Sequence, residues 1–123
     1  MVNTPALFDT CILIDYLRGV VEARLECDGY SDRSISIVSW MEIMAGATPA
    51  NEGDTQAFLL NFAVLPLDAD VAIAACHIRR QRRMSMSSAI VLATAATSGR
   101  ILLTRNTRDF PANTPGVRVP YEI

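Results

Sequence analysis

The sequence predicts one domain over residues 1–123, with a three-layer α/β/α fold and a mostly parallel sheet of about five strands. The chain is long enough for one compact domain and too short for two. Half of its residues are apolar, which suffices for a core without disulfides or structural metals. Short apolar runs alternate with helical patterns, and this alternation is typical of parallel strands that are covered by helices on both faces.

The first two predicted strands are each followed directly by a helix. Residues 6–9 form a short apolar strand, after which Thr10 is suited to cap a helix that ends at Gly19. Residues 34–38 alternate and are rich in β-branched side chains, a pattern that is typical of a strand. Ser39 is then suited to cap the second helix. These two strand-helix units indicate the α/β class.

Turn and cap signals define the rest of the chain. Pro, Gly, Asn and Asp are concentrated in residues 48–54, which predicts a loop. Asp68 is suited to cap a helix and Gly99 to end one. The remaining predicted elements are helices at residues 55–61, 69–82 and 89–97, the last opened by Ser87 or Ser88, and strands at residues 62–67, 100–104 and 117–119.

Three acids follow predicted strands closely, where an α/β sheet binds its ligands. Asp9 ends the first strand, Glu42 lies one turn into the second helix, and Asp109 follows the strand at residues 100–104. Ligands bind beyond the carboxyl ends of such strands, so these acids are expected at one rim. Clustered carboxylates repel each other, and either protonation of one acid or a hard divalent cation relieves the repulsion. The absence of lysine among the 11 basic residues favours the cation.

Charge and composition argue against several classes of function. The net charge of −2 argues against a protein that coats nucleic acid, so RNA contacts must come from local arginines or bound cations. Phosphotransfer proteins of this topology rely on a lysine, which the chain lacks. The only histidine, His77, lies mid-helix, which argues against a Ser-His-Asp triad and a two-histidine ribonuclease. No apolar run is long enough to cross a membrane, so a soluble, cytoplasmic protein is expected.

Four segments resemble the motifs of PIN-domain ribonucleases. Residues 8–15, Phe-Asp-Thr-Cys-Ile-Leu-Ile-Asp, are similar to the opening motif, and residues 36–46 are similar to the second. Residues 88–95 and 103–110 are similar to the third and fourth motifs. Each motif alone is weak, but four in the family's order over nearly the whole chain are specific. Bacterial VapC toxins of type II toxin-antitoxin systems are the subgroup that the chain resembles most.

The resemblance implies a metal-dependent endoribonuclease toxin. Asp9, Glu42 and Asp109 would be ligands of one or two Mg2+ or Mn2+ ions, and together with Ser88 they would form the catalytic set. The resemblance also implies a VapB-like antitoxin as partner, a homodimer, and transfer or ribosomal RNA as substrate. The candidates for substrate contact near the rim are Thr104, Arg105, Asn106 and Arg108.

Ser88 departs from the family's pattern, which has an aspartate at the start of the third motif. A serine hydroxyl can ligate Mg2+ but adds no charge, so the affinity for a cation is expected to fall. Two interpretations stay open: a nuclease that works with three acids, and an impaired PIN scaffold that still binds antitoxin or RNA. A metal-dependent DNA nuclease is a third, because the acids alone do not read the sugar.

Each candidate ligand also has a purely structural explanation. Glu42 can complete a capping box with Ser39, and Asp9 or Ser88 can cap a helix. Asp109, in the first turn of a short helical segment, can complement the helix dipole. The order of the four motifs favours the ligand role for the acids over these explanations.

Overall fold

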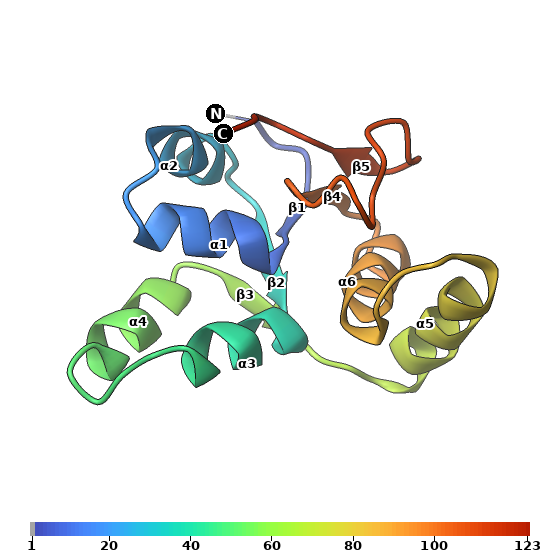
Figure 1. Ribbon diagram of the computed structural model, residues 1–123, viewed down its shortest axis with the longest axis horizontal. Coiled ribbons are helices and arrows are strands. Elements are labelled where there is room, and N and C mark those ends of the chain that lie inside the picture. Colours follow the sequence, from blue (N-terminus) through green and yellow to red (C-terminus); the bar gives the residue numbers. More distant parts are fainter. Residues whose placement is uncertain (1) are drawn as a thin grey trace.

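The computed structural model describes residues 2–123, which form five parallel strands and six helices (Figure 1). The strands lie side by side in the order β3-β2-β1-β4-β5. This arrangement confirms the predicted α/β class. The strands are β1 (Ala6–Phe8), β2 (Arg33–Ser36), β3 (Ala63–Leu65), β4 (Ile101–Leu103) and β5 (Val117–Arg118). The helices are α1 (Thr10–Leu17), α2 (Val21–Asp28), α3 (Ile37–Ala45), α4 (Glu52–Leu59), α5 (Ala69–Gln81) and α6 (Met86–Thr97).

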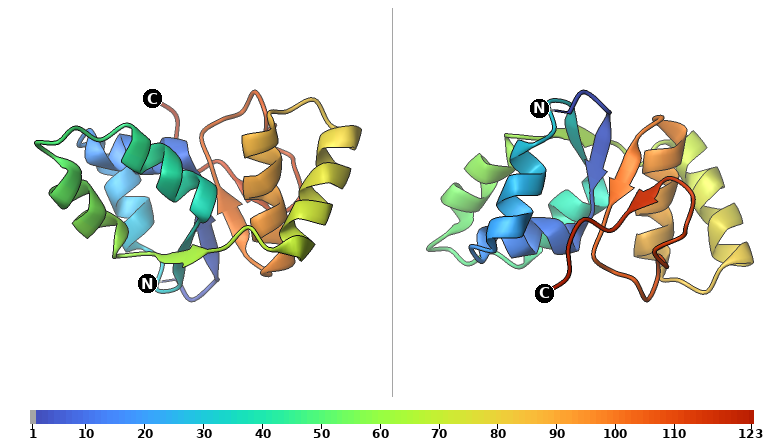
Figure 2. Two further views of the ribbon diagram at one scale, coloured as in Figure 1. Left: turned by 90° about the horizontal axis from the view of Figure 1, so that it is seen from below. Right: turned by 90° about the horizontal axis from the view of Figure 1, so that it is seen from above.

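Helices cover both faces of the sheet, which makes three layers. Helices α1 to α4 lie on one side and α5 and α6 on the other, as both views in Figure 2 show. Successive side chains of a strand point to opposite faces. Accordingly, Phe8 of β1 and Leu103 of β4 pack in the core under α1 to α4, whereas Leu7 and Leu102 pack in the second core under α5 and α6. The predicted α/β/α layering is confirmed.

The strand order reverses between β1 and β4. From β1 the chain proceeds outwards to β2 and β3, and it then returns to β4 on the opposite side of β1. Phe8 pairs with Leu103 at the carboxyl ends of these two strands. Such a reversal of strand order is where open α/β sheets bind ligands. The residues that follow β1 and β4 therefore occupy the place where a functional site is expected.

Three predicted helix starts are wrong, and in each case the chain uses an earlier residue as the N-cap. Asp9 caps α1, where its carboxylate accepts from the backbone N–H of Thr10 at 2.8 Å. Ser36 caps α3, and its hydroxyl accepts from the N–H of Val38 at 3.1 Å. Ser85 caps α6, and its hydroxyl accepts from the N–H of Ser88 at 3.0 Å. The side chains of Thr10, Ser39, Ser87 and Ser88 are thus free of the capping roles predicted for them.

Other elements differ from the prediction in length or were missed. Helix α4 begins at Glu52, inside the predicted loop, while the predicted cap Asp68 is confirmed at the start of α5. The sequence did not predict α2, because its buried positions are the small residues Ala23 and Cys27. Among residues 2–123, no helix is long and apolar enough to span a membrane.

Candidate active site

Asp9 lies directly after β1, where its backbone N–H donates to Leu103 of β4, and its surroundings oppose its negative charge. Its side chain is 8% exposed. The hydroxyl of Thr104, which follows β4, donates to Asp9 Oδ2 at 2.7 Å. Burial raises the pKa of the Asp9 carboxyl, and the nearby charge of Glu42 raises it further, while hydrogen bonds from Thr104, Thr10 and Cys11 lower it. A cation beside Asp9 would offset both the cost of burying its negative charge and its repulsion by Glu42.

Glu42 joins three helices at the same rim. Thr10 of α1 donates its hydroxyl to Glu42 Oε1 at 2.8 Å, and Ser87 of α6 donates to the same oxygen at 3.4 Å. Ser39, which is buried inside α3, lies with its hydroxyl oxygen 2.9 Å from that of Thr10. The capping box with Ser39, which was the structural alternative for Glu42, does not form, because Ser36 caps α3. Glu42 instead points from α3 towards α1 and α6.

Asp109 is held to the same region by Ser88. The Ser88 hydroxyl donates to Asp109 Oδ2 at 2.6 Å, and the Asp109 N–H donates to Asn106 Oδ1 at 3.3 Å. Asn106 in turn donates its backbone N–H to the Thr104 hydroxyl at 3.0 Å. Thr104 is also the residue that donates to Asp9. Asp109 is thereby linked through the loop after β4 to the acid that follows β1.

These contacts link the residues at the rim, and we call this set the acid ring. Hydrogen bonds lead from Asp9 through Thr10 to Glu42 and Ser87, and from Asp9 through Thr104 and Asn106 to Asp109 and Ser88. Ser87 and Ser88 are neighbours in the chain, which closes the ring. The three predicted acids are therefore connected, although they come from segments up to 100 residues apart in the sequence. The first turn of α6 lies between Glu42 and Asp109, where the family's aspartate would be.

The ring offers the donors that a hard divalent cation prefers, but the acids do not gather around one point. Mg2+ takes oxygen ligands, and the ring supplies three carboxylates and several hydroxyls. The salt bridges among residues 2–123 involve none of these three acids. Nevertheless, no group of three Asp, Glu, His or Cys side chains in the described chain is close enough to hold a metal ion. The donor types thus suit a hard cation, whereas the spacing of the three acids in this structure does not form a site for one.

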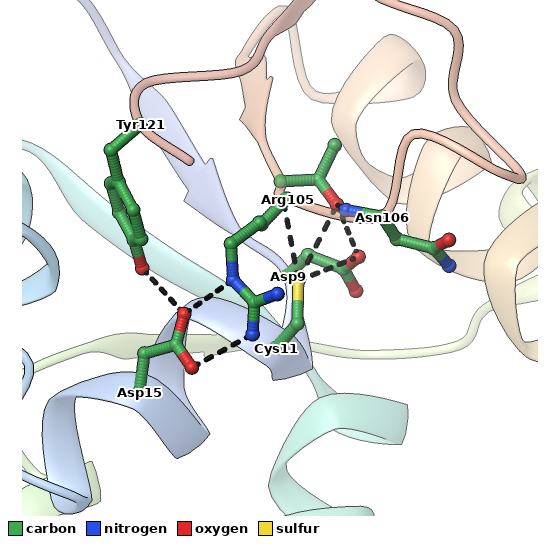
Figure 3. A network of polar contacts seen from close by, with 7 residues as sticks. Asp9, Cys11, Asp15, Arg105, Asn106 and Tyr121 are labelled. Carbon is green, nitrogen blue, oxygen red and sulfur yellow. Dashed lines mark hydrogen bonds and ion pairs between the residues drawn. The ribbon is translucent and has the colours of Figure 1, made fainter. Parts of the chain in front are cut away.

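Figure 3 shows a second polar network, which lies beside Asp9 and Cys11. Asp15 of α1 is 1% exposed and accepts two hydrogen bonds from the Arg105 guanidinium, at 2.7 and 2.9 Å. Tyr121, near the C-terminal end, donates its hydroxyl to Asp15 at 2.9 Å. Burial opposes ionisation of Asp15, but these hydrogen bonds outweigh it and lower the pKa of the carboxyl. The network fastens the loop after β4 and the C-terminal segment to α1.

Two predicted substrate contacts are thus occupied within the protein. Thr104 is fully buried and holds Asp9, so its position favours a supporting role over contact with a substrate. The guanidinium of Arg105 is bound to Asp15, and its backbone N–H donates to Cys11 Sγ at 3.3 Å. Asn106 and Arg108 stay candidates for substrate contact, because they are at least partly exposed. No local pattern in the sequence predicts the pairing of Asp15, since its partners lie 90 and 106 residues away.

Comparisons with known proteins agree with this fold. A family model described as "PIN domain" matches residues 6–113. A chain of a toxin-antitoxin complex from Klebsiella pneumoniae is 40% identical, with a TM-score of 0.90, and the match covers 96% of this chain and 99% of that one.

Two further structures are similar at lower identity. A chain of FitAcB from Neisseria gonorrhoeae is 22% identical with a TM-score of 0.79, and the match covers 96% of this chain and 99% of that one. A chain of DNA-bound VapBC from Salmonella typhimurium is 23% identical with a TM-score of 0.71, covering 94% and 96%. At this identity the two structures show likeness of fold alone. No match was found among curated proteins.

Proposed function

The chain belongs to the PIN domain family, and from this premise we propose that it is a Mg2+- or Mn2+-dependent endoribonuclease, the toxin of a VapBC-type toxin-antitoxin pair. The acid ring is the observation that supports the proposal most. Asp9, Glu42 and Asp109 come from three separate motifs, and hydrogen bonds through Thr10, Thr104 and Ser88 link them to one another's surroundings beside the strand reversal of the sheet. Acids that merely capped helices would not need to share one circuit of contacts.

The residues of the acid ring would have different roles in the hydrolysis of RNA. A divalent cation, when bound, polarises the scissile phosphate and supplies an activated water. Asp9 and Glu42 would hold this cation, with Thr104 and Thr10 keeping their carboxylates in place. The side-chain amide of Asn106 donates no hydrogen bond within the described chain, so it can donate to a phosphate oxygen. This proposal assigns no role to a histidine.

The second candidate function is an impaired PIN scaffold, and the bond between Ser88 and Asp109 favours it. At 2.6 Å this hydrogen bond engages one oxygen of the Asp109 carboxylate. A cation at Asp109 must then use the other oxygen, Oδ1, or share Oδ2 with the Ser88 hydroxyl. In this interpretation the protein retains its antitoxin or RNA contacts while the cleavage of RNA is slow. The two candidates differ in whether wild-type protein cleaves RNA at all.

A groove beside Glu42 is a suitable place for a VapB-like antitoxin. The groove has a volume of about 480 Å³ and lies between α1, α3 and α4. Ile14 and Leu17 of α1 line it and are 36% and 45% exposed, so a partner can cover apolar surface there. Arg18 and Glu42 add charge to its walls. An antitoxin segment in this groove would reach the acid ring at Glu42.

We further propose that the toxin forms a homodimer in the cytoplasm.

Cleavage of RNA in the presence of Mn2+ tests the proposal. Single-stranded RNA of mixed sequence and tRNA are incubated with wild-type protein, with Mn2+ or with EDTA. We expect cleavage with Mn2+ that is lost with EDTA and falls at least about 100-fold in Asp9→Asn. Single-stranded DNA of the same sequence, tested in parallel, distinguishes an RNase from a DNase. Equal cleavage by wild type and Asp9→Asn would refute the active site, and no cleavage by wild type would favour the impaired scaffold.

A further inference from the structure

A hollow lined by arginines adjoins the acid ring on the side of Asp109. It has a volume of about 390 Å³ and lies between the C-terminal end of α5, the start of α6 and the loop after β4. Asp109 and Met84 form part of its wall, so the hollow and the ring share one acid. Its lining residues are Arg79, Arg83, Met84, Ser85, Arg108 and Asp109.

Three guanidinium groups in this hollow have no acidic partner within residues 2–123. The salt bridges of the described chain involve other arginines, and Arg79, Arg83 and Arg108 are all exposed. The one acid in the wall, Asp109, already accepts a hydrogen bond from Ser88. Ser85 caps α6, so the positive end of a 12-residue helix faces the same hollow. The local charge is therefore strongly positive in a protein whose net charge is −2.

Helix capping alone does not explain this cluster. Arg79 and Arg80 lie in the last turn of α5, where a cation complements the helix dipole. Arg108, however, comes from the loop after β4, about 30 residues further along the chain, and lines the same hollow. Arg80 and Arg82 belong to the same basic run and do not line it. The hollow thus selects particular arginines from two segments.

We propose that this arginine pocket (Arg79, Arg83 and Arg108) binds a backbone phosphate of single-stranded RNA, next to the phosphate that is cleaved at the acid ring. The inference rests on the proposed nuclease function. A guanidinium presents a planar pair of donors that suits phosphate oxygens. A strand whose scissile phosphate lies at the ring must place a neighbouring phosphate close by, and the pocket shares Asp109 with the ring. Because the net charge is negative, RNA must be held by such local sites.

RNA binding in EDTA tests this pocket separately from cleavage. The probe is a short fluorescein-labelled single-stranded RNA of mixed sequence, and its Kd is measured by fluorescence anisotropy. The pocket variant is Arg83→Gln with Arg108→Gln, and the matched control is Arg80→Gln with Arg82→Gln, which removes the same charge. We expect the pocket variant to weaken binding about tenfold or more and the control less than about threefold. The slope of log Kd against log salt should fall by about 0.7 in the pocket variant.

Further measurements exclude trivial outcomes. Thermal unfolding confirms that both double variants fold, and Arg83→Lys with Arg108→Lys should restore the salt slope because it keeps the charge. Equal loss of RNA affinity in the pocket variant and the control variant overturns the proposal. Unchanged RNA affinity in the pocket variant also overturns it, even if the substitutions abolish binding of inorganic phosphate or an acidic peptide. If wild type cleaves RNA but the pocket variant binds it normally, the pocket fails and the nuclease function stands. If wild type neither binds nor cleaves RNA, the proposed function fails as well.

Discussion

Replacement of Ser88 by aspartate would place a carboxylate where the Ser88 hydroxyl now lies 2.6 Å from Asp109 Oδ2. In the absence of metal the change removes one hydrogen bond, worth about 1 kcal/mol. It also brings two like charges together, and at about 4 Å with an effective dielectric constant of about 20 they repel by about 4 kcal/mol. Because Asp109 is partly exposed, it can turn towards water and relieve part of this repulsion. We expect a net loss of about 3 kcal/mol in the free energy of unfolding.

A divalent cation reverses the sign of this effect. With Mn2+ present, the added carboxylate attracts the ion, and saturation at about 100 times Kd stabilises the folded state by about 2.7 kcal/mol. Thermal unfolding in EDTA measures the loss of stability without metal, and thermal unfolding in Mn2+ measures the stabilisation by the cation. For Ser88→Asp we expect a Tm about 10 °C below wild type in EDTA and a recovery of most of that difference in Mn2+. Wild-type protein should respond less to Mn2+, because Ser88 contributes no charge.

Two control variants separate charge from shape. Ser88→Asn has the size of aspartate without its charge, and Ser88→Ala removes the hydroxyl alone. Both should lose about 1 kcal/mol or slightly more, and neither should gain stability from Mn2+ beyond wild type. If Ser88→Asp is as stable as Ser88→Asn in EDTA, or if Mn2+ stabilises both equally, residue 88 does not face a shared cation site and the reasoning is refuted.

The remaining predictions concern the polar network around Asp15 and the apolar core. Asp15→Asn should lower the free energy of unfolding, measured in urea, by about 2 kcal/mol. This loss is smaller than for a fully buried ion pair, because the Arg105 side chain is 32% exposed. A loss below about 0.5 kcal/mol contradicts the prediction. The pKa of Asp15 is lowered from 3.8, so its stabilisation is complete above that pH and is lost as the pH falls through the folded-state pKa. The stability difference between wild type and Asp15→Asn should therefore shrink in strong acid and stay constant near neutrality. Leu102→Ala, in the centre of β4, should cost about 3 kcal/mol by the same urea measurement, whereas a change within 1 kcal/mol would contradict the burial of this strand.

The sequence identified the layers and the acids because both depend on strong, local patterns. Alternation of short apolar runs with helices determined the class, and each acid followed a strand whose end the pattern marked. The start of α3 shows the limit of such patterns. Ile37 and Val38 are β-branched and were assigned to a strand, but the Ser36 hydroxyl accepts from Val38 N–H and begins the helix there. At such a boundary a local capping hydrogen bond outweighs the β preference of two residues.

Long-range pairing was the part of the site that the sequence could not reveal. Asp15 finds Arg105 and Tyr121 across 90 and 106 residues, and no periodicity connects such partners. The same holds for the bond between Ser88 and Asp109, although the family's motifs identified both positions. The N-cap of α1 was predicted wrongly because Asp9 and Thr10 are both good N-cap residues. The structure shows that Asp9 caps the helix and that the Thr10 hydroxyl donates to Glu42.

Calorimetric titration with Mn2+ tests the acid ring most directly, since it needs neither the natural RNA nor an antitoxin. Wild type, Asp9→Asn and Glu42→Gln are titrated alongside the surface control Arg80→Gln. We expect saturable binding in wild type and in the control, and at least about a tenfold loss of affinity in each acid variant. Equal affinity in all four proteins would show that these acids do not bind the cation.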